Sequence, residues 1–182
     1  MNIKVLIAKG FEEIEAITLI DLLRRAGYNL TTVSISTSKE VIGGHNIKIF
    51  TDSTFDAESF EDMDMLLLPG GGDGVLNLAS ENKVLDLIKK TFSNDKYIAA
   101  ICAAPFVLDR AGILDGREVT CFPTWQDKIV SGTVKNENIL VDGKIITGRG
   151  VGAAIDMGLK IVEILSSKEA SENLRKKVLY RI

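Results

Sequence analysis

Cys102 is the residue whose type and position most clearly suggest chemistry. It follows the apolar run 97–101 and precedes Ala103, Ala104 and Pro105, so the sequence predicts a strand that turns sharply into a helix at this cysteine. Such an elbow lifts the side chain above the sheet and points the first N–H groups of the helix toward the sulfur. Those donors favour the nucleophilic thiolate and would hold the pKa of the thiol well below its ordinary value of about 8.5. The alternative is a buried structural cysteine, since free cysteines are among the most buried residues.

Glu15 is the second candidate, because it lies on the apolar stripe of a helix predicted over residues 12–26. A carboxylate on such a stripe is costly to ionise, so we expect its pKa to be raised. A protonated Glu15 near Cys102 can donate a hydrogen bond to the thiolate, or act as a general acid and base. The stripe alone equally allows a simpler role, in which acidic residues complement the N-terminus of the helix. We assign Glu12 and Glu13 to that simpler role.

A run of glycines, Pro69–Gly72, directly follows the apolar segment 63–68. Glycine permits close approach of the backbone, so the N–H groups of Gly70 and Gly71 can bind an oxyanion or a small anionic ligand. The run matches neither the phosphate loop nor the dinucleotide-binding fingerprint. A tight turn alone explains it equally well.

His45 is the single histidine of the chain, and it lies on or beside a predicted hairpin over residues 40–50. A Cys-His pair within one chain would require this hairpin to reach Cys102, which we do not expect. We therefore interpret His45 as a surface residue. One histidine and two distant cysteines give no metal-ligand spacing, so we expect no metal site. The other cysteine, Cys121, lies in a weak strand and is predicted to be inert.

The segments that position these residues alternate between strands and helices. Strands are expected at 3–8, 30–35, 63–68 and 97–101, with a weak one at 119–121 and hairpins at 40–50 and 138–147; helices are expected at 12–26, 82–92, about 105–110, 153–165 and 168–177. This alternation predicts a doubly wound, mostly parallel α/β sheet between layers of helices. Ligands of such sheets bind beyond the carboxyl ends of the strands, where the three candidate loops should meet.

The composition narrows the class of protein. The 182 residues are 46% hydrophobic and 26% charged, which is typical of a globular chain, and we expect one domain over residues 1–182. The net charge is −3 with scattered basic residues, so a nucleic-acid partner is not expected. Two cysteines argue against a disulfide framework. Without an apolar signal sequence or an 18-residue apolar run, we expect a cytoplasmic protein with no membrane partner.

Five segments in order along the chain resemble the ThiJ/PfpI superfamily, specifically the DJ-1-like branch of the parkinsonism-linked deglycase and its bacterial relatives. The segments are Ala8–Glu15, Arg24–Gly27, Leu68–Gly71, Ala99–Pro105 and Thr147–Gly152. The resemblance implies a flavodoxin-like sandwich that forms a homodimer. It also implies that Cys102 is the oxidation-sensitive nucleophile, that Glu15 is the acid hydrogen-bonded to it, and that the Gly71 and Ala103 N–H groups line the adjacent anion pocket.

One feature departs from the superfamily pattern. Many members have a histidine directly after the cysteine or about twenty residues later, where this chain has Ala103 and Phe122. Ala103 argues against the peptidase-like branch. Phe122 leaves proton transfer to Glu15 alone, or to a group from a partner subunit. His45 aligns with a basic position near the dimer interface of the superfamily, so it is a candidate for a contribution in trans.

Two functions follow from this resemblance. The first is a cofactor-independent glyoxalase III or protein deglycase, in which the Cys102 thiolate attacks a methylglyoxal-like 2-oxoaldehyde, or its protein adduct, and Glu15 moves protons. The second is a non-enzymatic oxidative-stress sensor or chaperone-like protein in which Cys102 is oxidised to a sulfinate. We expect no cofactor; a flavin is disfavoured because Glu12 and Glu13 occupy the loop where its phosphate would bind.

Overall fold

Seven strands form the central sheet of the computed structural model, which describes residues 1–181. Their bounds are β1 (Asn2–Ile7), β2 (Asn29–Ser34), β5 (Ser53–Thr54), β6 (Met65–Leu68), β7 (Tyr97–Ile101), β10 (Ile139–Asp142) and β11 (Ile145–Gly148). The order across the sheet is β10-β11-β7-β6-β1-β2-β5. Every neighbouring pair is parallel except β10 with β11. The mostly parallel sheet predicted from the sequence is therefore confirmed.

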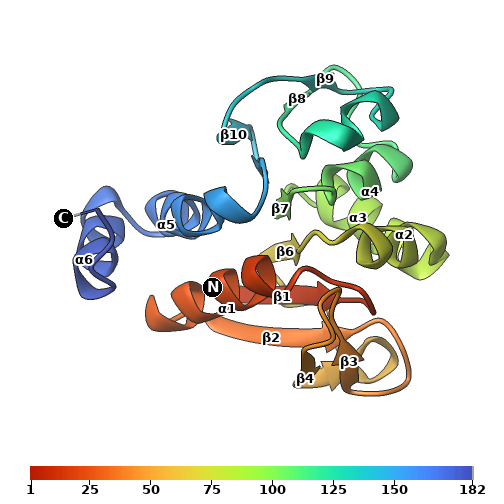
Figure 1. Ribbon diagram of the computed structural model, residues 1–182, viewed down its shortest axis with the longest axis horizontal. Coiled ribbons are helices and arrows are strands. Elements are labelled where there is room, and N and C mark those ends of the chain that lie inside the picture. Colours follow the sequence, from red (N-terminus) through yellow and green to blue (C-terminus); the bar gives the residue numbers. More distant parts are fainter. Residues whose placement is uncertain (182) are drawn as a thin grey trace.

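Helices cover both faces of this sheet, as Figure 1 shows. The α-helices are α1 (Glu13–Arg25), α2 (Gly72–Ser80), α3 (Asn82–Ser93), α4 (Pro105–Arg110), α5 (Ala154–Leu165) and α6 (Lys168–Lys177); the short 3₁₀ helices are η1 (Phe55–Ala57), η2 (Pro123–Lys128) and η3 (Val151–Ala153). Along β1, Val5 and Ile7 face the core under α1 and α5, whereas Leu6 faces the core under α2, α3 and α4. Burial on both faces explains why this strand is continuously apolar. No helix within residues 1–181 is long and apolar enough to cross a membrane.

Two elements differ from the sequence-based expectations. The segment after Gly71 forms the helix α2, which we had not predicted because its glycines lower helix propensity. Burial of Val75 and Leu78 in the core compensates for that loss. The weak strand expected over 119–121 ends at Val119, in β8 (Glu118–Val119), which pairs in parallel with β9 (Thr133–Val134) in a separate small sheet.

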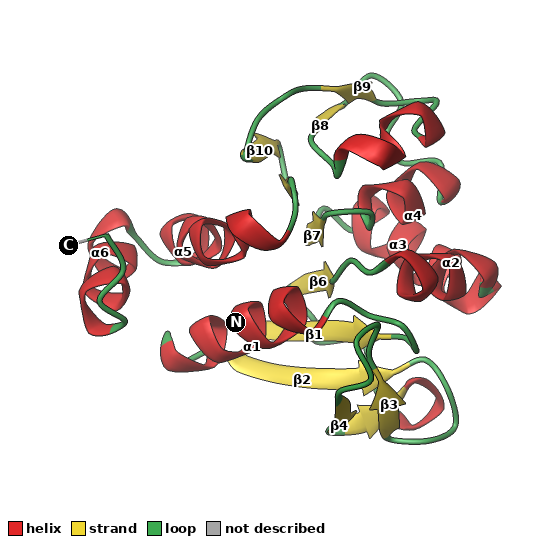
Figure 2. Ribbon diagram, viewed as in Figure 1, coloured by secondary structure: helices red, strands yellow, loops and turns green. Residues whose placement is uncertain are grey.

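The first predicted hairpin is confirmed, but it forms a sheet of its own. It consists of β3 (Glu40–Ile42) and β4 (Lys48–Phe50), which are antiparallel, and Figure 2 shows it beside the carboxyl ends of β1 and β2. Two backbone hydrogen bonds join it to the loop after β1: Gly10 N–H donates to Ile42 O at 2.8 Å, and Gly44 N–H donates to Phe11 O at 2.8 Å. The tip of the hairpin is therefore fixed at the edge of the sheet where ligands are expected. The second hairpin is also confirmed, and its strand β11 belongs to the central sheet.

Candidate active site

The three loops singled out in the sequence meet at the carboxyl edge of the sheet. Glu12 N–H, in the loop after β1, donates to Gly70 O in the loop after β6 at 2.9 Å. A methyl group added at Gly71 would lie 2.3 Å from Gly10 O, so these two loops approach as closely as backbones can. Gly71 has a φ of 96°, a conformation that also favours glycine. Both properties explain the glycine run better than a turn alone would.

Cys102 lies at a strained turn between β7 and α4. Its φ is 64°, which is uncommon for a residue other than glycine and costs of order 1–3 kcal/mol. Its N–H donates to Gly148 O at 2.8 Å and its carbonyl accepts the Phe122 N–H at 2.8 Å, so neighbouring segments hold the turn in place. The side chain is half-buried. This is the geometry of the elbow predicted from the sequence.

Glu15 is completely buried, on the face of α1 that packs into the core. Its Oε2 accepts the Gly70 N–H at 2.9 Å, while Oε1 has no hydrogen-bonding partner among residues 1–181. A methyl group added at Gly70 would lie 2.5 Å from Glu15 Oε2 and 2.6 Å from Cys102 Cβ. Both side chains thus pack against Gly70, and the fold brings the two predicted residues together.

The electrostatics of this pair differ in part from our expectation. Burial raises the pKa of Glu15 from 4.5 to about 7, as expected, although contacts with the Cys102 side chain and the Gly70 N–H oppose the shift. Burial, together with the charge of the adjacent Glu15, raises the pKa of Cys102 from 9.0 to about 12. The expectation of a thiol with a lowered pKa is therefore wrong while Glu15 is ionised, because two neighbouring negative charges repel each other in a poorly hydrated site.

The two groups therefore hold a single proton between them over a broad pH range. Strongly interacting groups titrate as a pair, and the proton can lie on the sulfur or on the carboxyl group. Protonation of Glu15 removes the negative charge that raises the pKa of Cys102. It also supplies a hydrogen for the otherwise unpartnered Oε1. The arrangement can thus form a thiolate beside a neutral carboxylic acid without releasing a proton to solvent.

The three predicted N–H donors have different roles in the structure. The N–H groups of Gly71 and Ala103 reach the Cys102 sulfur and favour its negative charge. The Gly70 N–H is instead taken by Glu15, so it is not free to bind an oxyanion as the sequence suggested. Gly71 is the N-cap residue of α2, and its N–H reaches the sulfur instead.

A pocket of about 800 Å³ lies over these residues. Its walls come from the loop after β1, the start of α2, the elbow and the hairpin tip. Gly10, Phe11, Glu12, Glu13, Ile14, Gly44, His45, Ile47, Gly71, Gly72, Asp73, Cys102, Phe122 and Val151 line it. Phe122 contributes an exposed aromatic ring, so the position that carries a histidine in many superfamily members is an apolar wall here.

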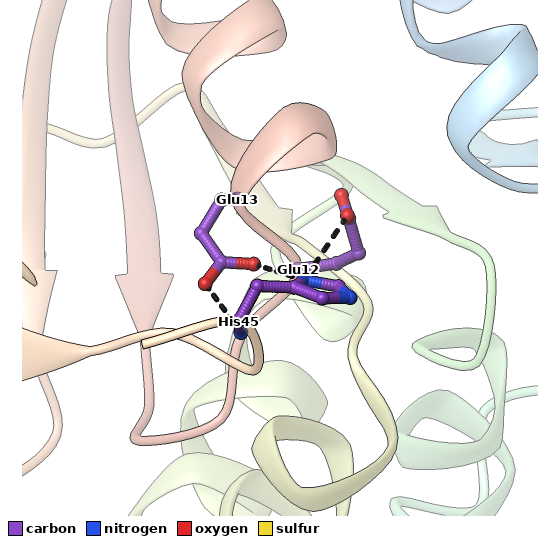
Figure 3. A group of neighbouring side chains, drawn as sticks. All are labelled: Glu12, Glu13 and His45. Carbon is purple, nitrogen blue, oxygen red and sulfur yellow. Dashed lines mark hydrogen bonds and ion pairs between the residues drawn. The ribbon is translucent and has the colours of Figure 1, made fainter. Parts of the chain in front are cut away.

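Glu13 differs from its expected role, and the hairpin reaches the pocket that Cys102 lines, although His45 itself is exposed as expected. The His45 Nδ1 atom and backbone N–H bond to the two oxygens of Glu13 at 2.7 and 2.6 Å, and Figure 3 shows that carboxylate held against both groups of the histidine. Glu13 is thus buried and anchors the hairpin, instead of merely complementing the helix N-terminus. His45 lies on the rim of the same pocket as Cys102, although no hydrogen bond joins them within the described chain. Glu12 does cap α1, accepting the Glu15 N–H at 2.8 Å.

No sequence signal identifies this contact, because Glu13 and His45 are 32 residues apart. The nearest clue is Gly43, where a methyl group would lie 2.2 Å from Glu13 Oε1, but a glycine in a hairpin is also typical of a turn.

Glu12, Glu13 and His45 could offer ligand atoms to a metal, since one such atom from each lies within 4.8 Å of the others. Both Glu13 oxygens already accept N–H groups or contact the imidazole, and Glu12 caps the helix. We therefore assign these residues to hydrogen bonding.

Cys121 differs from Cys102 in its accessibility and in having no acidic partner. It is completely buried, and burial raises its pKa from 9.0 to about 11, with Arg149 opposing the shift. It does not line the pocket. This environment is that of an inert thiol.

Comparisons with known proteins agree with this geometry. Residues 1–164 match the DJ-1/PfpI family. The chain is 35% identical to Protein DJ-1 homolog B of Arabidopsis thaliana over 98% of its own length and 41% of that relative's, so it spans less than half of that protein. It is 34% identical to Protein dj-1beta of Drosophila melanogaster, over 96% of this chain and 95% of the relative. It is also 34% identical to the glutathione-independent glyoxalase DJR-1.2 of Caenorhabditis elegans, over 91% and 88%.

Solved structures of DJ-1 proteins are also similar to this chain. Drosophila melanogaster DJ-1beta matches with a TM-score of 0.96 at 32% identity, covering 100% of this chain and 98% of that one. The oxidized form of Toxoplasma gondii DJ-1 matches with a TM-score of 0.95 at 30% identity, covering 100% and 99%. The flavodoxin-like fold is confirmed, and the chain belongs to the DJ-1/PfpI family.

Proposed function

We propose that this protein is a cysteine-dependent, cofactor-independent enzyme of the glyoxalase III or protein deglycase type. The observation that carries the proposal is the contact of Cys102 with buried Glu15 beside Gly70, beneath an accessible pocket. The name of the Caenorhabditis elegans relative, a glutathione-independent glyoxalase, supports the same chemistry. The proposed substrates are methylglyoxal-like 2-oxoaldehydes or their adducts on proteins.

The reaction begins when the proton shared by the pair lies on Glu15. The Cys102 thiolate adds to the aldehyde carbon, and the resulting oxyanion takes a proton to give a hemithioacetal. Glu15, now a carboxylate, removes the proton from carbon one and returns it to carbon two. The hydroxyl proton moves from the oxygen on carbon one to the oxygen on carbon two, and the hemithioacetal becomes a thioester of the 2-hydroxy acid. Water then adds to the thioester carbonyl, the C–S bond breaks, and the hydroxy acid leaves while the pair regains its proton. The sum is one aldehyde and one water consumed for each hydroxy acid formed.

Two features of the site support this sequence. The N–H groups of Gly71 and Ala103 favour negative charge at the sulfur, and the same donors are placed to stabilise the oxyanion formed beside it. The raised pKa of Glu15, about 7, suits a group that both gives and accepts protons near neutral pH. The thiol must stay reduced to react, so we propose the cytoplasm as the location.

Homodimer formation is part of this proposal. Exposed apolar side chains extend from the pocket rim along α1. Ile14 and Ile47 line the pocket over Cys102, and Ile17 and Leu179 line a second pocket. A continuous exposed apolar surface of this kind favours association with another protein surface. The chain's own copy is the partner that the family resemblance implies.

The experiment measures lactate after methylglyoxal is added to the reduced protein without glutathione. Cys102→Ser should abolish lactate formation, Glu15→Gln should slow it on the order of 10²-fold, and Cys121→Ser should leave it unchanged. If folded, reduced wild-type protein forms no more lactate than buffer does, the glyoxalase proposal is wrong. Release of free lysine from a methylglyoxal-modified peptide tests the deglycase form in the same way.

A peroxide sensor is the second candidate, favoured by the half-exposed Cys102 and by the oxidized Toxoplasma gondii structure among the neighbours. One peroxide would convert the thiolate into a sulfenate and water, and a second would give the sulfinate and another water. Mass spectrometry after limited peroxide should then find oxidation at Cys102 alone. Equal oxidation of Cys102, Cys121 and the methionines would count against a tuned sensor.

A further inference from the structure

Glu13 and His45 form a hydrogen-bonded pair at the pocket that the steps above do not use. His45 is the only imidazole in the chain and lines the same pocket as Cys102. Its side chain is 73% exposed, whereas that of Glu13 is 5% exposed. A titratable group that is exposed in the pocket of the reacting residue and held by a buried carboxylate has the arrangement of an oriented general base.

The orientation of His45 is fixed at two points. Glu13 Oε1 accepts the His45 backbone N–H at 2.6 Å and that of Ile47 at 3.4 Å, which holds the hairpin tip. Glu13 Oε2 lies 2.7 Å from Nδ1 of the ring. With the Nδ1 proton donated to Glu13, the lone pair of the neutral ring is on Nε2, which has no hydrogen-bonding partner among residues 1–181. Nε2 is therefore available to take a proton from water.

The charged groups around His45 act on its pKa. Glu12 Oε1 lies 4.0 Å from Nδ1, and Asp73 at the start of α2 lines the same pocket. On the hairpin, the charge of Lys48 is paired with that of Glu40 at 3.1 Å. Carboxylates thus dominate the environment, and the hydrogen bond and charge of Glu13 raise the pKa of His45.

Glu15 contacts the Cys102 side chain, so it lies near the carbon that is bonded to the sulfur, but it is poorly placed to act on a water molecule in the pocket. It is completely buried beneath the cysteine, on the side away from solvent, and it does not line the pocket. The last step of the proposed reaction needs a base for a water molecule that arrives from the pocket. We propose that His45 is the catalytic base of this hydrolytic step, acting in its own chain, and that Glu13 is its positioning residue.

This inference rests on the proposed function and assigns its last step. Nε2 of His45 takes a proton from water as the water oxygen bonds to the thioester carbon. The C–S bond then breaks, and its electron pair stays on the Cys102 sulfur. The proton leaves His45 to solvent from the exposed rim, the Cys102–Glu15 pair takes the proton of the new carboxylic acid, and the hydroxy acid departs as its carboxylate.

The experiment follows the covalent intermediate after methylglyoxal is mixed with the whole protein and quenched with acid. Intact-mass spectrometry reports the fraction of Cys102 that carries the hydroxyacyl group, and lactate is measured in parallel. His45→Gln should accumulate the acyl-enzyme and form lactate on the order of 10²-fold more slowly. His45→Arg should do the same, since arginine keeps the positive charge beside Glu13 but does not titrate. Lys48→Gln, on the same hairpin, is the control and should behave as the wild type does.

Glu13→Gln tests the role of His45 through the pH dependence of acyl-enzyme breakdown, which a purely structural role of Glu13 would not change. In the wild type, breakdown of the acyl-enzyme should accelerate as the pH rises through the pKa of His45, because only the neutral ring accepts a proton. Removing the Glu13 charge lowers the pKa of His45, so the rate of acyl-enzyme breakdown should begin to rise at a lower pH. If His45→Gln turns over like the wild type without accumulating the acyl group, the inference is wrong while the proposed function stands. If the wild type forms no lactate, both fail.

Discussion

At the scale of single residues, the central feature is one proton shared between Cys102 and Glu15. The carboxyl group has one N–H donor and no exposed surface, while the sulfur has two N–H donors and partial exposure. Both groups are costly to ionise, and they cannot both be ionised near neutral pH without strong repulsion. Reactivity therefore depends on where the remaining proton lies, rather than on the thiol alone.

The first prediction concerns stability and Glu15. Because the pKa of this carboxyl group is 4.5 when unfolded and about 7 when folded, the folded protein binds more protons between those pH values. Its stability should fall as the pH rises through this window, by at most about 3 kcal/mol. Glu15→Gln removes this dependence, so the variant should gain stability relative to the wild type as the pH rises. Urea unfolding at several pH values between the two pKa values measures the free energy of unfolding of each protein. Glu169→Gln, on the exposed face of α6, is the control. A constant difference between variant and wild type would contradict the raised pKa.

The sequence predicted which residues meet, but not their charges. Cys102 at a strand end and Glu15 on an apolar stripe were both identified from local patterns, and the structure brings them together. The direction of the Cys102 pKa shift was missed, because it depends on the burial and the charge of a neighbour 87 residues away (102 minus 15). The role of the Gly70 N–H was missed for the same reason, since its acceptor lies on another element.

At the scale of elements, the site depends on how closely two loops approach. The loop after β1 and the start of α2 meet at Gly10 and Gly71, and both have positive φ angles. The alternation of apolar runs and helical spacing predicted the strands and most helices. It missed α2 and the docking of the β3–β4 hairpin, because tertiary packing decides both and leaves no local period in the sequence.

The second prediction tests the close contact of these two loops at Gly71. Gly71→Ala would place a methyl group 2.3 Å from Gly10 O in a backbone of φ 96°, so the two loops would have to separate. We expect a loss of about 1–3 kcal/mol in the free energy of unfolding and slower alkylation of Cys102. Gly152→Ala, where a methyl group meets nothing within 4 Å, is the matched control and should be nearly neutral. Equal stability of the two variants would show that the loops are not packed as described.

At the scale of the whole molecule, exposed apolar side chains gather beside the pocket. Ile14 and Ile17 are 57% and 45% exposed on α1, and Ile47 is 54% exposed on the hairpin. A partner that covers this surface would also wall one side of the pocket. Association and the reactive site are therefore expected to be coupled.

The third prediction is that the protein is a homodimer through this surface. Ile17→Glu should raise the dissociation constant of the dimer at least ~10-fold, which corresponds to about 1.4 kcal/mol. Val130→Glu, at a residue that is 84% exposed elsewhere, is the control and should leave the dimer intact. Sedimentation velocity over a range of concentrations measures both. A monomeric wild type, or equal effects of the two variants, would contradict the proposed interface.

The most direct test of the account is the pH dependence of Cys102 alkylation by iodoacetamide, in the wild type and in Glu15→Gln. If the cysteine transfers its proton to Glu15, the wild-type rate should rise near the pKa of the pair at about 7, far below 12. In Glu15→Gln no neighbouring charge raises the pKa of Cys102, so its rate should keep rising with pH where the wild-type rate levels off, while buried Cys121 stays slow in both proteins. The account is contradicted if Cys102 in the wild type reacts no faster than Cys121 at neutral pH. It is equally contradicted if Glu15→Gln has the same pH profile as the wild type, since Cys102 would then not share its proton with Glu15.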